Sequence, residues 1–323
     1  MPAWVAVSVV AAFLQNLRSA LQKTLTPRVG VLGATYARFL FAAPLAAGLV
    51  ALLALREPLP RVTAGFVGWG LAGAGMQVGA TLMLLRVFSL RNFAVGNTFA
   101  KTETVQAGLF GLVLLGDRLG ALALLGIVGS LAGIVLLSTL RVEGRRAFDR
   151  AAGLGILSGS AFALSAVAYR GAALALGGEP GALMRPAFTL ACVTLVQALV
   201  MGGGLAVAAR GTIGAVLRAW RVALPVGAAG MLASLGWFTA FTLATVAQVK
   251  AVGQIELVFN WLTARFAFGE RPSPRETAAI ASGSRSPSHV VSAMVWTSVT
   301  QASVKAGPTI GPPRSPSDSV APR

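Results

Sequence analysis

The sequence has little charge, almost no cysteine and a single histidine. Only 11% of its 323 residues are Asp, Glu, Lys or Arg, whereas soluble domains usually carry about 25%. The one cysteine, Cys192, lies in an apolar run, which excludes a disulfide framework and a thiolate metal cluster. The one histidine, His289, cannot build a histidine-based metal site. We therefore expect no metal and no cofactor.

What the sequence does contain is a series of long apolar runs. Hydrophobic residues make up 55% of the chain and its mean hydropathy is +0.75. Most runs reach the roughly 20 residues that a helix needs to cross the hydrocarbon core. The predicted spans cover residues 3–21, 31–55, 64–85, 93–115, 119–140, 152–176, 183–208, 222–245 and 250–268. This pattern predicts an all-α, polytopic membrane helix bundle of a bacterial-type inner membrane.

The net charge of +17 does not indicate nucleic-acid binding. The Lys and Arg residues flank the apolar runs as short loop clusters and form no basic face. In a membrane protein such flanks set orientation. We expect the partners to be the lipid bilayer, a small-molecule substrate and protons. Glycine pairs four residues apart, such as Gly75 and Gly79, permit a homodimer as well as tight packing within one chain.

The composition changes after residue 270. Half of the sixteen prolines lie in residues 271–323, together with many Ser and Thr. Such a stretch cannot bury enough apolar surface to order itself. We predict that it is disordered, or the product of a shifted reading frame near residue 281, where a tenth span should begin.

Two segments of the chain repeat a rare pattern of polar residues. Residues 94–118 and 247–271 align without a gap at an offset of 153. Each copy places a glutamate, Glu103 or Glu256, thirteen residues before a turn of glycine, an acidic residue and arginine. Five predicted spans, an odd number, separate the copies, so they must cross the membrane in opposite senses. This predicts an inverted repeat, as in many secondary transporters, whose site lies near the midplane.

These motifs resemble a family, the ten-span transporters with two EamA-type repeats in the drug/metabolite transporter (DMT) superfamily. The family carries Glu-Pro in an apolar helix, then a Gly-Glu-Arg-Leu turn and a glycine-rich helix. The first copy here reads Glu103-Thr104 and Gly116-Asp117-Arg118-Leu119, and the second reads Glu256-Leu257 and Gly269-Glu270-Arg271-Pro272. Both copies lack the proline, and the second repeat lacks its final helix.

The resemblance covers residues 3–275 and implies two inverted five-helix repeats, with the last helix missing or degraded. On this interpretation residues 1–145 form the first EamA-like repeat and residues 146–270 the second, followed by the tail at 271–323. It also implies export of a small metabolite. Substrate class and direction rest on the resemblance alone.

Polar groups inside the predicted spans are the candidate site residues, because burying an ionisable group in lipid is costly. Glu103 and Glu256 lie roughly 20 Å from their turns at 1.5 Å per residue. Desolvation favours a neutral carboxylic acid, which suits a group that holds and releases a proton. The candidate substrate- or proton-binding residues are Glu103, Glu256, Lys101, Lys250, Gln106, Gln254, Asn97, Arg38, Gln77 and Trp237.

Each candidate also has a structural interpretation. The glutamates could pair with a cation on a neighbouring helix, and either lysine could supply that cation or bind an anionic substrate group. Arg18, Arg38 and Arg170 could snorkel to the headgroups. Neutral polar residues such as Gln77 could form hydrogen bonds between helices, and Trp237 could contribute only to helix packing.

We predict a non-enzymatic secondary transporter that exports an amino-acid-like or drug-like metabolite in exchange for protons. One rival is a lipid-modifying membrane enzyme, which would need a loop-borne cluster of nucleophiles that these short loops do not offer. Another is a non-transporting scaffold or decayed copy, which the missing tenth span favours. Costly carboxylates at the midplane argue against a pure scaffold.

Overall fold

The computed structural model describes residues 2–90, 103–117, 141–142, 145–146 and 150–266. The predicted span at 119–140 and the tail at 271–323 lie outside this part of the chain. The helices are α1 (Ala3–Ala54), α2 (Ala64–Leu90), α4 (Glu103–Leu115), α6 (Arg150–Ala175), α7 (Met184–Ala208), α8 (Arg210–Arg218), α9 (Trp220–Leu243), α10 (Val246–Val252) and α11 (Glu256–Phe266), and a 3-10 turn, η1 (Gly253–Ile255), joins the last two. Two-residue strands β1 (Arg141–Val142) and β2 (Arg145–Arg146) pair antiparallel.

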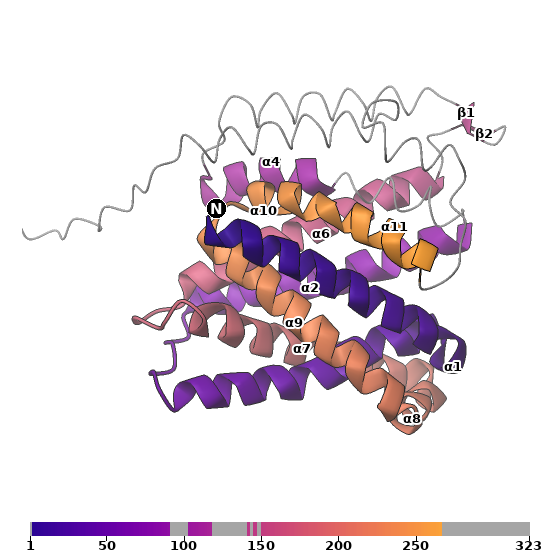
Figure 1. Cartoon of the computed structure of the whole chain (residues 1–323), viewed down its shortest axis with the longest axis horizontal. Coiled ribbons are helices and arrows are strands. Elements are labelled where there is room, and N and C mark those ends of the chain that lie inside the picture. The colour runs from indigo at the N-terminus through magenta and orange to yellow at the C-terminus, as the bar shows by residue number, and fades with distance from the viewer. Residues whose placement is uncertain (1, 91–102, 118–140, 143–144, 147–149, 267–323) are drawn as a thin grey trace, which may run out of the picture.

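The long helix α1 is two helices joined at Gly30. This residue has φ 71° and ψ 172°, a left-handed conformation that glycine adopts without steric cost. The chain reverses direction there (Figure 1), and Gln22 Nε2 donates to the Ala34 carbonyl across the bend at 3.1 Å. The predicted span over 3–21 is therefore too short, because the first helix continues as far as the glycine.

Two further elements differ from the prediction. The short helix α8 (Arg210–Arg218) lies in a segment that we predicted to be a connection. The predicted span at 250–268 begins earlier, at Val246, and is interrupted by η1. The predictions over 31–55, 64–85, 152–176, 183–208 and 222–245 agree with the helices to within a few residues.

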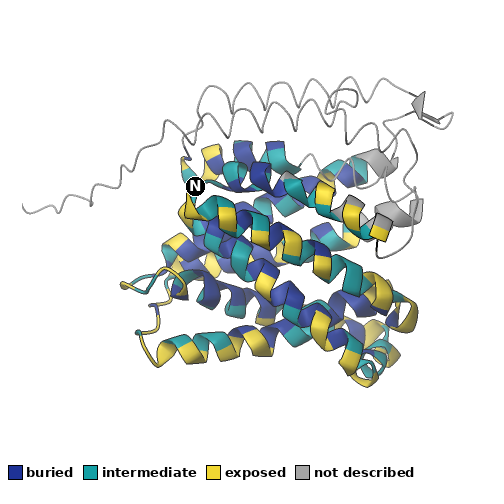
Figure 2. Ribbon diagram, in the orientation of Figure 1, coloured by how far each residue is buried: buried dark blue, intermediate teal, exposed yellow. Residues whose placement is uncertain are grey.

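Several helices have the composition of membrane spans. Ala3–Ala54, Met184–Ala208 and Trp220–Leu243 are long and apolar enough to cross a membrane. Exposed residues lie along the outer faces of the helices (Figure 2). Many of them are large and apolar, and lipid would cover such side chains. Examples are Leu52, Leu55, Val113, Leu199 and Val207. The chain is therefore a membrane-associated helical protein.

The helices pack in two main groups. α1 packs against α9, α7 and α11, and α6 packs against α2 and α4. Small residues let the backbones approach, as is usual between helices in membranes. In the pair α2–α6, a Cβ on Gly73 would lie 2.6 Å from the Tyr169 ring and one on Gly171 would lie 2.9 Å from the Trp69 ring. Each helix thus accommodates an aromatic ring of the other.

Candidate functional site

An ion pair joins α4 to α10. Lys250 Nζ donates to Glu103 Oε1 at 2.8 Å, and the side chains are only 20% and 18% exposed. The ammonium also lies 5.6 Å from the centre of the Trp237 ring and 6.0 Å from that of Phe241. A cation over an aromatic face is attracted by the ring quadrupole. Lys250 is therefore held between a carboxylate and two rings of α9.

The position of Lys250 follows from a capping box at the start of α10. Gln248 N donates to Thr245 Oγ1 at 3.4 Å, and Thr245 N donates to Gln248 Oε1 at 3.2 Å. This reciprocal pair satisfies two amides that a helix start leaves unbonded. The chain thus turns sharply after α9, and Lys250 returns over the rings of that helix. The Thr-x-x-Gln spacing is visible in the sequence, and it could have placed a helix start at Thr245.

Glu256, the repeat partner of Glu103, has a different environment. Gln15 Nε2 donates to Glu256 Oε2 at 2.7 Å. Trp237 Nε1 donates to the other atom of the same amide, Gln15 Oε1, at 2.9 Å. Arg18, one turn further along α1, interacts with Glu256 electrostatically. Glu256 is thus tied to α1, whereas Glu103 is tied to α10.

The two glutamates are joined through one buried tryptophan. Trp237 faces Lys250 with its ring and Gln15 with its N–H, so Glu103, Lys250, Trp237, Gln15 and Glu256 form a continuous chain of contacts. We call these five residues the glutamate relay.

Gly253 makes room for the indole of the relay. A Cβ at this position would lie 2.6 Å from Cη2 of Trp237. The interruption of the helix at η1 therefore coincides with close contact between backbone and ring.

A second polar cluster lies between α2, α6 and α7. Gln77 Oε1 accepts from Tyr169 Oη at 2.8 Å and from Gln197 Nε2 at 2.6 Å. Gln197 Nε2 also donates to Tyr169 Oη at 3.0 Å. This agrees with the structural interpretation of Gln77, which holds three helices together.

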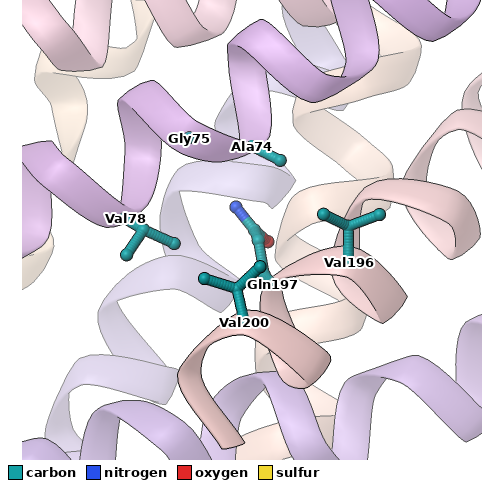
Figure 3. A pocket seen from close by; sticks show the side chains of 6 residues that line it. All are labelled: Ala74, Gly75, Val78, Val196, Gln197 and Val200. Carbon is teal, nitrogen blue, oxygen red and sulfur yellow. The ribbon is translucent and has the colours of Figure 1, made fainter. Parts of the chain in front are cut away.

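A small pocket adjoins this cluster (Figure 3). It has a volume of about 30 Å³ and is lined by Ala74, Gly75, Val78, Val196, Gln197 and Val200. That volume holds a water molecule but no metabolite. This pocket is therefore too small to hold a substrate.

Arg170 binds the backbone carbonyls at the C-terminal end of α9. Its Nη1 donates to the carbonyls of Phe241, at 2.5 Å, and Ala244. Its Nη2 lies 3.3 Å from Asp117 Oδ1. The last carbonyls of a helix lack partners within it, and a cation there also opposes the helix dipole. This contact could not be predicted from the sequence, because it depends on how α6 packs against α9.

Asp117, the acidic residue of the first repeated turn, thus has a structural partner. Gly116 before it has φ 66°, and Asp117 N donates to the Gly111 carbonyl at 3.1 Å. This is a glycine-capped helix end. The turn therefore ends α4 and places the Asp117 carboxylate next to the Arg170 guanidinium.

The other candidates are placed as follows. Arg38 lies in the second half of α1, half-buried, with Nη2 3.5 Å from Ser234 Oγ of α9. Gln106 lies on α4, one turn after Glu103. Asn97, Lys101 and the side chain of Gln254 lie outside the described residues.

The comparisons bear on the fold alone. No protein-family model and no curated protein matches the chain. A solved structure described only as "Crystal structure of protein" is similar, with a TM-score of 0.62 and 20% sequence identity. The match covers 95% of this chain and 99% of that one. The helical arrangement therefore occurs in an experimentally determined protein, and the likeness carries no function.

Proposed function

We propose that this chain is a secondary transporter of the inner membrane that exports a small metabolite, amino-acid-like or drug-like, in exchange for protons. The glutamate relay carries the proposal. It joins two repeat-related carboxylates within the bundle through Lys250, Trp237 and Gln15. Ionisable groups inside a membrane are costly, and in transporters they mark proton and substrate paths.

The relay offers a way to couple a proton to a substrate. When Glu103 is ionised, it accepts a charged hydrogen bond from Lys250. Protonation of Glu103 removes that charge and weakens the ion pair. The contacts of the Lys250 ammonium with the rings of Trp237 and Phe241 then become its main interactions. Trp237 also donates to Gln15, which holds Glu256. A proton on one carboxylate and a substrate at the other therefore compete through shared residues.

The packing of the helices supports an inverted repeat. In the proposed first repeat, α1 packs against α9 and α11 of the second, and in the second, α6 packs against α2 and α4 of the first. A two-fold axis in the membrane plane would exchange these contacts in this way. Alternating access would then arise from rocking of one repeat against the other around a fixed site. We propose on this basis that the chain is a DMT-type transporter with two EamA-like repeats.

The experiment is proton flux in proteoliposomes. Purified protein is reconstituted with a pH-sensitive dye inside, a pH gradient is imposed, and amino acids and lipophilic amines are added one by one. We expect at least one compound to cause proton flux in liposomes that contain the wild type. The same compound should cause no flux with Glu103→Gln or Glu256→Gln. Glu179→Gln, which makes the same charge change at an exposed loop residue, should transport normally. Equal flux in the Glu103→Gln variant and the wild type would contradict the proposal.

A non-transporting scaffold is the second candidate. It is favoured by the fact that Glu103 and Asp117 are each paired with a cation of another helix, as structural carboxylates would be. A folded wild-type protein that moves no protons with any compound would support this candidate.

A further inference from the structure

Two arginines meet at one glycine within the bundle. Arg18 comes from the first half of α1 and Arg38 from the second. A Cβ on Gly230 of α9 would lie 3.3 Å from Arg18 Cδ and 3.2 Å from Arg38 Cγ. The absence of a side chain at Gly230 therefore lets both arginine stems pass the same point of α9.

Arg38 has few polar partners for a guanidinium. Its Nη2 lies 3.5 Å from Ser234 Oγ, at the limit of a hydrogen bond, and its Cζ lies 5.0 Å from the centre of the Phe39 ring. Within the described part of the chain, no carboxylate lies within ion-pair distance of Arg38. A guanidinium offers five N–H donors, so most of those of Arg38 are available.

Arg18 adds a second positive charge beside it. Its Nη2 donates to Ser19 Oγ at 3.3 Å, and its Nε is buried without a hydrogen-bond partner. Glu256 stabilises Arg18 electrostatically, while Arg18 and Arg38 repel each other. The described surroundings therefore supply one negative charge for two guanidinium groups.

The other cations near this part of the bundle are balanced differently. Lys250 lies against Glu103 and Arg170 against Asp117. Nor does Arg38 reach towards the headgroups. Its contact, Ser234, lies about 21 Å from the start of α9 and about 14 Å from its end at 1.5 Å per residue. The unbalanced charge is therefore held at mid-depth in the helix bundle, where an unpaired cation is most costly.

We infer that Arg18 and Arg38 bind an oxyanion group, a carboxylate or phosphate, of the transported molecule. The inference rests on the proposed function and adds the chemistry of one end of the substrate. Guanidinium groups match such oxyanions with paired hydrogen bonds. An amino-acid-like substrate would place its carboxylate between the two arginines. A lipid phosphate presents the same chemistry, so the experiment has to separate the two sources.

The test is protection of Arg38 from chemical modification. The wild type in dodecyl maltoside is treated with phenylglyoxal, which modifies arginine, and peptides containing Arg38 and Arg221 are followed by mass spectrometry. Arg221 is the internal control, because it is exposed and also lies near an aromatic ring, 5.6 Å from the centre of Trp220. Succinate, inorganic phosphate and phosphatidylglycerol are the probes, with chloride at equal ionic strength as reference.

We expect succinate or inorganic phosphate to slow modification of Arg38 about tenfold at about ten times its dissociation constant, and to leave Arg221 unchanged. Three results would overturn the inference, namely no protection, equal protection of both arginines, or protection by phosphatidylglycerol alone.

A variant series gives an independent readout. Succinate or phosphate should raise the unfolding temperature of the wild type and Arg221→Gln, and should have no such effect on Arg38→Gln. A ligand-induced shift that persists in Arg38→Gln would overturn the inference. If that variant does not fold, the protection assay on the wild type decides. Binding is measured without a gradient, so it can fail while proton flux persists, or persist while flux fails.

Discussion

The indole N–H of Trp237 donates to Oε1 of Gln15 at 2.9 Å, and this bond fixes which way the amide of Gln15 points. The amide nitrogen is left facing Glu256, to which it donates at 2.7 Å. A tryptophan on α9 thus determines the hydrogen bond that a glutamate on α11 receives from α1. Rotating the amide would set two donors against each other at one end and two acceptors at the other.

Replacing Gln15 with Leu should therefore destabilise the protein. The substitution leaves the buried indole N–H of Trp237 without its acceptor and removes a donor from Glu256. An unsatisfied buried polar group costs about 1–3 kcal/mol, so we expect a loss of about 2 kcal/mol in the free energy of unfolding. Denaturation in detergent, followed by circular dichroism, measures it.

The control is the same change in a Trp237→Phe background. Phenylalanine keeps a ring but has no N–H, so Gln15→Leu should cost less there than in the wild type. Equal costs in the two backgrounds would show that the two side chains are not coupled.

Replacing only the lysine of the ion pair between Lys250 and Glu103 should lower the free energy of unfolding more than replacing both charged residues. Lys250→Met leaves a largely buried carboxylate without its cation, for which we expect a loss of about 3 kcal/mol. Adding Glu103→Gln should restore part of that stability, because no unpaired charge remains. The free energies of unfolding of the wild type, both single variants and the double variant give the coupling. A double variant less stable than Lys250→Met would argue that the pair is not coupled as described.

Two glycines of α2 should respond oppositely to alanine. A Cβ at Gly73 would lie 2.6 Å from the Tyr169 ring, whereas one at Gly79 would meet nothing within 4 Å. Gly73→Ala should therefore destabilise the protein by about 1–3 kcal/mol through overpacking. Gly79→Ala should stabilise it by up to about 1 kcal/mol, since alanine is the better helix former. Thermal unfolding of the matched pair tests both signs, and a shared sign would contradict the close contact of α2 and α6 at Gly73.

The capping box at Thr245 should contribute about 1 kcal/mol to the free energy of unfolding. Thr245→Val removes the oxygen that accepts from Gln248 N, and loss of such a cap typically has this effect. Thr245→Ser keeps the oxygen and should behave like the wild type. Because α10 carries Lys250, Thr245→Val should also weaken the lysine–glutamate pair, so that the cost of Glu103→Gln becomes smaller in its background. An unchanged cost would show that the cap does not position Lys250.

The sequence predicted most helices because their signal is local. Apolar runs of the length of a bilayer, bounded by charged turns, located α2, α6, α7 and α9 to within a few residues. It missed the continuation of α1 to Gly30, because the residues from Gln22 to Val29 are too polar to read as a span. It also missed α8 and the interruption at η1, since neither element has the length of a span.

For the site, rarity of residue type was the useful signal. Glu103, Glu256, Lys250 and Trp237 stand out in a chain with so few charged and aromatic residues. Their pairing was not predictable, because Lys250 and Glu103 are 147 residues apart and Gln15 and Glu256 are 241 residues apart. The sequence indicated Arg38 as a candidate substrate- or proton-binding residue, with headgroup contact as the alternative for both Arg18 and Arg38. It did not place the two arginines together, because only the bend at Gly30 brings them to the same glycine of α9.

The sequence by itself determined that this is a helical membrane-associated protein, approximately where most of its helices lie, and which few side chains are costly to bury. These properties depend on composition and on short-range periodicity, which each segment carries independently of the rest. The tertiary structure decided which of those side chains neutralise one another and which remain unbalanced. Charge pairing depends on distances of a few ångströms between helices that are far apart in the chain, and only the packed bundle fixes those distances.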